Sequence, residues 1–195
     1  MTSIGIFVFD GAEELDFVGP WEVLAMWAQQ WPDDDVSVFT VSQTEGVVEA
    51  AKGMRILADH TWETAPAMDV LVYPGGRGTR GQVGDETIRA WVRGIADGGA
   101  LMTSVCTGSL VYADAGLLDG RPATTHWLAL DLLAGLGADV EVRPDDRWVD
   151  DGPVITASGV SAGIDMALHL VARLGSAERA REVRRAIQYD PAPPV

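Results

Sequence analysis

The chain contains a single cysteine, and its place in the sequence suits a nucleophile. Cys106 follows the apolar run "ALMTSV" and precedes Thr-Gly-Ser and a helix-like pattern. Such a strand-turn-helix segment lifts a side chain above a sheet and holds it at a helix N-terminus, as in a nucleophile elbow. The positive end of that helix favours a thiolate, which is the attacking form of cysteine. An inert core cysteine, the commoner fate of a lone thiol, is the alternative.

A second segment, "YPGGRG", is predicted to stabilise the charge that an attacking thiolate creates. Gly75 and Gly76 directly follow a predicted strand, and their lack of side chains leaves backbone N–H groups open to an anion. An ordinary tight turn explains the same glycines. The overlapping "GRGTRG" matches the dinucleotide pattern G-x-G-x-x-G, but a stiff proline precedes it and the chain holds 22 glycines. We therefore do not expect a nucleotide cofactor.

Asp16 is the candidate proton carrier. It lies in "EELDFVGP", which we interpret as a loop between the first strand and a helix that opens at Gly19-Pro20. Its apolar neighbours desolvate the carboxyl in part, which raises its pKa and suits it to proton transfer. From the local sequence alone, a solvated loop aspartate near a helix start is the favoured interpretation.

His126, in "TTHWLAL", follows a short predicted strand and precedes a helix. It could act as a base, a substrate contact or a helix cap, and a structural role is at least as consistent with the sequence. The three histidines lack the spacing of a zinc site, and the acidic segment "RPDDRWVDDG" does not match a calcium loop. We predict no metal and no organic cofactor.

These residues need a sheet to bring them together, and the chain alternates short apolar segments with amphipathic ones. We expect strands at 3–9, 36–42, 69–73, 100–105 and 123–125, hairpins at 47–57 and 147–156, and helices at 19–31, 85–96, 108–115, 127–136, 161–174 and 177–188. This order predicts one domain over residues 1–195, with a mostly parallel sheet covered by helices on both faces. Loops at the carboxyl ends of its strands would gather Asp16, Gly76, Cys106 and His126.

The amino-acid composition limits the kinds of partner that the protein is expected to bind. The formal charge is −15, from 29 acidic and 14 basic residues, and such a surface repels nucleic acids and anionic membranes. The N-terminal "MTSIGIFVFDG" lacks a basic region and is interpreted as a strand, not a signal peptide. No apolar run reaches the roughly 18 residues of a membrane span. We expect a cytoplasmic protein that binds a small molecule.

Taken together, "VFDGAEELDFVGPWEVL", "DVLVYPGGRG", "TSVCTGSLVYADAGLLDGRPATTHW" and "ASGVSAGIDMAL" resemble the ThiJ/PfpI superfamily, and within it the isocyanide hydratase branch. The resemblance implies a flavodoxin-like three-layer α/β/α sandwich and a homodimer with the site near the interface. It also implies roles for five residues. Cys106 would be the nucleophile and Asp16 its acidic partner. Gly76 and Thr107 would line the pocket, and Val160 would begin a helix near the cysteine.

At two positions this chain departs from the pattern of other branches of the superfamily, which narrows the choice of branch. Proteases and amidotransferase-type members usually carry histidine next to the cysteine, where this chain has Thr107, which argues against peptide or glutamine hydrolysis. Glyoxalase-like members tend to carry glutamate where this chain has Asp16. Both departures favour the hydratase branch. Related branches that share the cysteine motif include the amidotransferase-like domains of some transcription regulators.

The resemblance thus predicts an isocyanide hydratase, which converts R–N≡C and water into an N-substituted formamide. Cys106 would attack the terminal carbon to give a covalent thioimidate, while Asp16 supplies a proton and then activates water. A glyoxalase-like hydro-lyase acting on methylglyoxal, assisted by His126, is a second hypothesis. A non-enzymatic ligand or oxidation sensor, whose thiolate forms a sulfinic acid, is a third.

Overall fold

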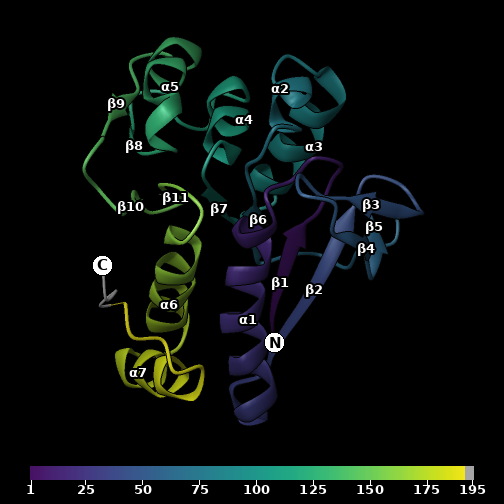
Figure 1. Ribbon diagram of the computed structural model, residues 1–195, viewed down its shortest axis with the longest axis vertical. Coiled ribbons are helices and arrows are strands. Elements are labelled where there is room, and N and C mark those ends of the chain that lie inside the picture. Colours follow the sequence, from purple (N-terminus) through teal and green to yellow (C-terminus); the bar gives the residue numbers. More distant parts are fainter. Residues whose placement is uncertain (192–195) are drawn as a thin grey trace.

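A mostly parallel sheet forms the centre of the computed structural model, which describes residues 1–191 (Figure 1). Within those residues seven strands are ordered β10-β11-β7-β6-β1-β2-β5, and the β10–β11 pair is antiparallel. The strands are β1 (Thr2–Phe7), β2 (Val36–Ser42), β5 (His60–Thr61), β6 (Val70–Tyr73), β7 (Leu101–Val105), β10 (Trp148–Asp150) and β11 (Val154–Ala157). The predicted α/β class with a mostly parallel sheet is confirmed.

Helices flank this sheet. They are α1 (Glu14–Gln30), η1 (Pro32–Asp34), α2 (Thr79–Gln82), α3 (Glu86–Asp97), α4 (Gly108–Asp114), η2 (Trp127–Ala129), α5 (Leu130–Leu136), α6 (Ala162–Leu174) and α7 (Ala177–Ala186). Helices α1, α6 and α7 pack against one another, whereas α4 contacts β7, α3 and α5 (Figure 1). Strands β6 and β11 are buried along their whole length, as continuous apolar runs in a covered parallel sheet should be.

Two short strand pairs lie outside the main sheet. The predicted hairpin at 47–57 is confirmed as antiparallel β3 (Val47–Glu49) and β4 (Arg55–Leu57). The strand expected at 123–125 is shorter, as β8 (Pro122–Ala123), and it pairs only with β9 (Glu141–Val142). His126 therefore does not follow a strand of the main sheet, which corrects the expected layout.

The first helix begins earlier than predicted. We expected Pro20 to open it, but α1 starts at Glu14 and Pro20 lies inside it, so Asp16 sits in the first helical turn and not in a loop. Proline inside a helix removes a backbone hydrogen bond. Here the ring is buried against α6, where a Cβ on Gly163 would come within 3.3 Å of it. Pro20 is therefore part of the contact between α1 and α6.

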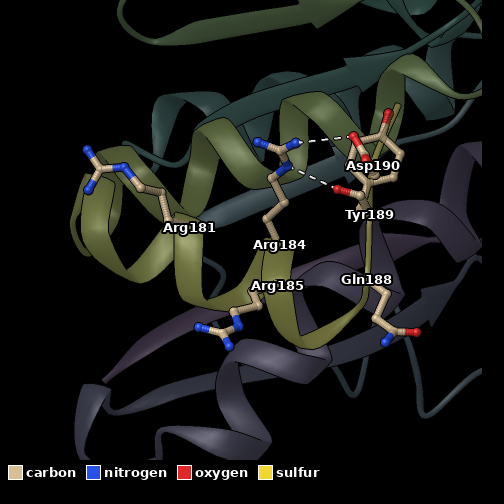
Figure 2. A pocket seen from close by; sticks show the side chains of 6 residues that line it. All are labelled: Arg181, Arg184, Arg185, Gln188, Tyr189 and Asp190. Atoms are coloured by element: carbon tan, nitrogen blue, oxygen red, sulfur yellow. Dashed lines mark hydrogen bonds and ion pairs between the residues drawn. The ribbon is translucent and has the colours of Figure 1, made fainter. Parts of the chain in front are cut away.

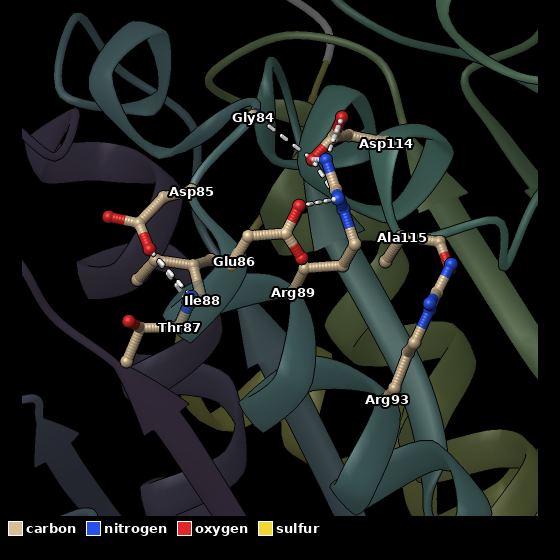
Figure 3. A network of polar contacts seen from close by, with 9 residues as sticks. All are labelled: Gly84, Asp85, Glu86, Thr87, Ile88, Arg89, Arg93, Asp114 and Ala115. Carbon is tan, nitrogen blue, oxygen red and sulfur yellow. Dashed lines mark hydrogen bonds and ion pairs between the residues drawn. The ribbon is translucent and has the colours of Figure 1, made fainter.

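A polar network ties α3 to α4, the helix that begins just after Cys106 (Figure 3). Arg89 donates through Nη2 to Asp114 Oδ1 at 3.0 Å, and Asp114 Oδ2 accepts from Gly84 N–H at 3.0 Å. Arg93 Nε donates to the Ala115 carbonyl at 2.7 Å. These contacts hold the C-terminal end of α4 in place, and with it the helix that supports the cysteine turn.

The described part of the chain continues past α7 to residue 191. This helix stops at Ala186, two residues before the predicted end, and Arg184 Nε donates to the Tyr189 carbonyl at 3.0 Å (Figure 2). The prolines of the tail "YDPAPPV" predict that it does not continue the helix. Residues 189–191 are indeed not helical, and residues 192–195 lie outside the described part of the chain. None of the helices formed by residues 1–191 has the length and apolar character needed to cross a membrane.

Candidate active site

The carboxyl ends of four neighbouring strands meet at one edge of the sheet. In sheet order these strands are β11, β7, β6 and β1, and all three pairs among them are parallel. Val160 follows β11, Cys106 follows β7, Gly75 follows β6, and Asp16 follows β1. The expected gathering of Asp16, Gly76 and Cys106 at this edge is confirmed.

Cys106 occupies a strained turn between β7 and α4. Its φ of 56° lies in the left-handed region, which costs a non-glycine residue free energy unless neighbours hold it there. Four contacts do so. The Cys106 N–H donates to the carbonyls of Ser158 at 2.6 Å and Ala157 at 3.1 Å, and its own carbonyl accepts from Thr125 Oγ1 at 2.9 Å and Ser109 Oγ at 3.1 Å. This is the elbow geometry that the sequence predicted.

The turn after β6 packs directly on this elbow. A Cβ on Gly75 would lie 2.5 Å from the Thr107 nitrogen and 2.8 Å from Cys106 Cβ. A Cβ on Gly108 would lie 2.4 Å from the Tyr73 carbonyl oxygen. Real Cβ atoms do not approach backbone so closely, so both positions require glycine because of the close approach of two chain segments.

We expect Gly75→Ala to damage the site more than the fold. The added methyl must push the elbow away by several tenths of an ångström, which should lower the free energy of unfolding by about 1–3 kcal/mol and catalytic turnover by roughly 100-fold. Chemical denaturation and steady-state kinetics measure the two effects. Gly81→Ala is the matched control, because nothing lies within 4 Å of its added methyl. Wild-type turnover in Gly75→Ala would contradict the close approach.

Asp16 is fully buried, and one of its carboxyl oxygens is held in place. Oδ2 accepts from the Gly75 N–H at 2.9 Å. The Cys106 thiol is near enough to the carboxyl to lower its pKa, and among residues 1–191 Oδ1 has no hydrogen-bond partner. Burial, followed by the charge of Glu13, raises the pKa of Asp16 to about 7. The raised pKa predicted from its apolar neighbours is confirmed.

The surroundings of Cys106 act against the thiolate that the sequence analysis expected. Burial, followed by the negative charge of Asp16, raises the pKa of the thiol to about 12. The N–H groups of Thr107 and Val160 act in the opposite direction, but they do not offset the first two causes. The sulfur therefore needs a base when it attacks, and the unpartnered Oδ1 of Asp16 is suited to that task.

The N–H groups of Gly75 and Gly76 are already engaged, so the expectation that they are free to bind an anion is wrong. Gly75 donates to Asp16, and Gly76 donates to Thr107 Oγ1 at 3.0 Å. Thr107 Oγ1 also lies 3.0 Å from Thr79 Oγ1. The two glycines therefore fix the carboxyl and the threonine in place. The donors that face the sulfur are the Thr107 and Val160 N–H groups.

Val160 adopts a backbone conformation that is rare for its residue type. Its φ is 47°, and a β-branched side chain in the left-handed region is a clear outlier. The residue precedes α6, as the resemblance implied, and its N–H is near enough to the Cys106 sulfur to lower the pKa of the thiol. The strain therefore accompanies a contact to the reactive atom. The sequence placed Val160 near the cysteine but carried no signal for this conformation.

A cavity of about 230 Å³ opens beside Cys106, Thr107 and Val160. Its apolar wall consists of Leu110, Leu128, Ala129 and Leu132. Its polar wall includes Glu13, Arg77 and Arg80, which the sequence analysis did not single out. The two arginines lie in "GRGTRG", and their spacing of three residues was the available signal.

His126 caps a helix at the edge of this cavity. Its Nδ1 accepts from the Leu128 N–H at 3.2 Å, so the proton of the neutral ring is on Nε2. A Cβ on Gly159 would lie 2.6 Å from the ring, which shows how closely the imidazole is packed. Of the three roles that the sequence left open, the structure shows the helix cap.

The sequence profile of the DJ-1/PfpI family matches residues 2–173. The chain belongs to this family. An isonitrile hydratase from Pseudomonas putida is 40% identical over 192 residues, which cover 98% of this chain and 80% of the relative. The transcriptional regulator CdhR from Pseudomonas aeruginosa is 32% identical over 173 residues, covering 89% of this chain and 51% of the regulator.

Solved structures of the DJ-1/PfpI family share the fold. A ThiJ/PfpI protein from Pseudomonas syringae superposes with a TM-score of 0.87 at 34% identity, covering all of this chain and 77% of the other. DJ-1beta from Drosophila melanogaster superposes with a TM-score of 0.84 at 23% identity, covering 97% and 98% of the two chains. The resemblance read from the sequence motifs is therefore confirmed at the level of family and fold.

Proposed function

We propose that this DJ-1/PfpI protein is an isocyanide hydratase. The observation that carries the proposal is the pairing of a lone thiol with a buried carboxyl whose pKa is about 7 and whose free oxygen has no other partner among residues 1–191. The similarity to an isonitrile hydratase over 98% of the chain supports the same reaction. A carboxyl with this pKa can accept and return a proton near neutral pH.

The first half of the reaction adds the thiol to the isocyanide. As the sulfur attacks the terminal carbon of R–N≡C, Asp16 takes the thiol proton and delivers it to the same carbon. The C–S bond forms, the carbon gains one hydrogen, and the product is the thioimidate R–N=CH–S–Cys106. The Thr107 and Val160 N–H groups stabilise negative charge on the sulfur while the proton is on Asp16.

The second half adds water. Asp16 takes one proton from a water molecule whose oxygen bonds to the thioimidate carbon and passes that proton to the nitrogen, which gives R–NH–CH(OH)–S–Cys106. The C–S bond then breaks with its electron pair going to sulfur, the carbonyl forms, and Asp16 carries the hydroxyl proton to the thiolate. The sum is R–N≡C plus water giving R–NH–CHO, with the thiol and the carboxylate regenerated and no redox change.

Formamide production tests the proposal directly. We would incubate the purified protein with a panel of isocyanides, including cyclohexyl isocyanide, and follow the loss of the isocyanide stretch by infrared spectroscopy and the formamide by mass spectrometry. The expected result is enzymatic formamide formation. No formamide from any isocyanide would contradict the substrate class. Lactate from methylglyoxal would instead favour the glyoxalase-like reaction, and peroxide oxidation of Cys106 without turnover would favour the sensor.

The rate should rise with pH through about 7. Asp16 accepts the thiol proton only as a carboxylate, and its pKa is raised to about 7 by burial, so the active form is lost as the pH falls below that value. Measuring kcat/KM from pH 5 to pH 9 should give one inflection near 7 and a plateau above it. A profile that stays level over this range would contradict the role of Asp16 as base.

A further inference from the structure

Two arginines line the cavity that contains Cys106. Arg77 and Arg80 lie three residues apart in a helical turn, where Arg80 N–H donates to the Arg77 carbonyl at 3.3 Å, so their side chains share one face. The stem of Arg77 passes close to Gly11, where an added Cβ would meet Arg77 Cγ at 3.1 Å. The segment "GRGTRG" therefore contributes two arginines to the wall of the cavity.

The two guanidinium groups give the cavity a local positive charge. Within residues 1–191 neither Arg77 nor Arg80 forms an ion pair, whereas most other arginines of this chain do. Glu13 is the acidic residue of the cavity wall, and it is ion-paired with Lys52. On a chain with a formal charge of −15, two arginines without an ion-pair partner among residues 1–191 lie at the cavity of the reactive thiol, and the acid of that cavity wall is paired with Lys52.

We infer that the Cys106 cavity recognises substrates that carry a small anionic group, a carboxylate, on an apolar spacer. The guanidinium fork matches the two oxygens of a carboxylate. Leu128 and Leu132 supply the apolar surface for the spacer, and the volume of about 230 Å³ limits the ligand to a small molecule. Combined with the proposed function, on which this step rests, the preferred substrate is a short isocyano-alkanoate anion.

Alkylation of Cys106 tests the anion site without relying on isocyanide chemistry. Iodoacetate and iodoacetamide have nearly the same shape, but the first carries a carboxylate, and the single cysteine makes each adduct a simple mass shift. We would measure both alkylation rates at pH 8 in the wild type and in Arg77→Gln/Arg80→Gln. The ratio of the two rates cancels any change in the intrinsic reactivity of the thiol.

The expected result is a fall in the iodoacetate-to-iodoacetamide ratio by roughly fivefold to tenfold in the glutamine pair. Arg77→Lys/Arg80→Lys keeps the charge and should retain most of the ratio. Arg181→Gln/Arg185→Gln is the matched control, because it removes the same charge from two exposed arginines at the distant α7 cavity (Figure 2). An unchanged ratio in the cavity pair, or an equal fall in the α7 pair, would overturn the proposal.

Substrate kinetics extend the test to turnover. A short isocyano-alkanoate should have a higher kcat/KM than its methyl ester in the wild type, and Arg77→Gln/Arg80→Gln should bring the ratio of the two kcat/KM values close to one. A wild-type preference for the ester would contradict the anion site. If neither compound is hydrated, the proposed reaction fails, and the alkylation ratio still decides whether the cavity selects anions.

Discussion

Replacing Cys106 with alanine abolishes formamide production from every isocyanide that the wild type hydrates. The alanine variant has no atom that can bond to the terminal carbon, so the covalent route is closed, and we expect a loss of at least about 10⁴-fold in kcat. The elbow holds Cys106 through backbone contacts to Ala157, Ser158, Ser109 and Thr125, none of which needs the sulfur. The variant should therefore fold normally.

Cys106→Ser is the matched second variant. It keeps a nucleophilic atom of similar size, but the hydroxyl is a poorer nucleophile than the thiol at this pH, so we expect activity near that of the alanine variant. Mass spectrometry of the wild type under rapid quench should show an adduct equal to the mass of the isocyanide. Full turnover by the alanine variant would rule out covalent catalysis by this residue, whatever the fate of the adduct.

Asp16→Asn should lower turnover by roughly 100- to 10,000-fold, the range typical of lost general acid–base catalysis. The amide oxygen can still accept from the Gly75 N–H, so the turn after β6 is preserved. The amide cannot take the thiol proton, and the inflection near pH 7 should disappear with it. Wild-type kinetics in this variant would show that Asp16 does not carry the proton.

The same substitution should change how stability depends on pH. Burial raises the pKa of the folded-state carboxyl from 3.8 to about 7, so the folded protein holds this proton more tightly than the unfolded chain does. The free energy of unfolding that this tighter proton binding contributes is fully present below about pH 4 and is lost as the pH rises towards 7. Three pKa units correspond to roughly 4 kcal/mol as an upper value.

The difference in unfolding free energy between Asp16→Asn and the wild type should therefore shift in favour of the variant by up to about 4 kcal/mol from pH 4 to pH 8. Comparing the two pH values removes any constant cost of burying the amide. Urea denaturation at both values measures the shift. Glu22→Gln, an exposed position on the same helix, is the control with the same charge change. Equal shifts in both variants would contradict the buried, raised-pKa state of Asp16.

The sequence by itself determined the order of the main strands and helices and the turns that follow β6 and β7. Apolar runs predicted the strands that precede Gly75 and Cys106, because a strand buried on both faces of a parallel sheet has to be apolar throughout. The turn to helix after Cys106 was predicted from Thr-Gly-Ser, and the carboxyl ends of parallel strands necessarily share one edge. Local patterns were sufficient for these features because each depends on residues close together in the chain.

Only the tertiary structure decided which groups of the site are hydrogen-bonded to one another and how the pKa of the Cys106 thiol is shifted. Asp16 and Gly75 are separated by 59 residues, and their hydrogen bond both fixes the carboxyl and removes an N–H group that the sequence left free. Burial and the charge of Asp16 raise the pKa of the thiol, and both depend on distances across the fold. The part that Arg77 and Arg80 take in the cavity wall was also missed, because the sequence predicted the turn after β6 to lie near Cys106 but not which of its side chains line the cavity.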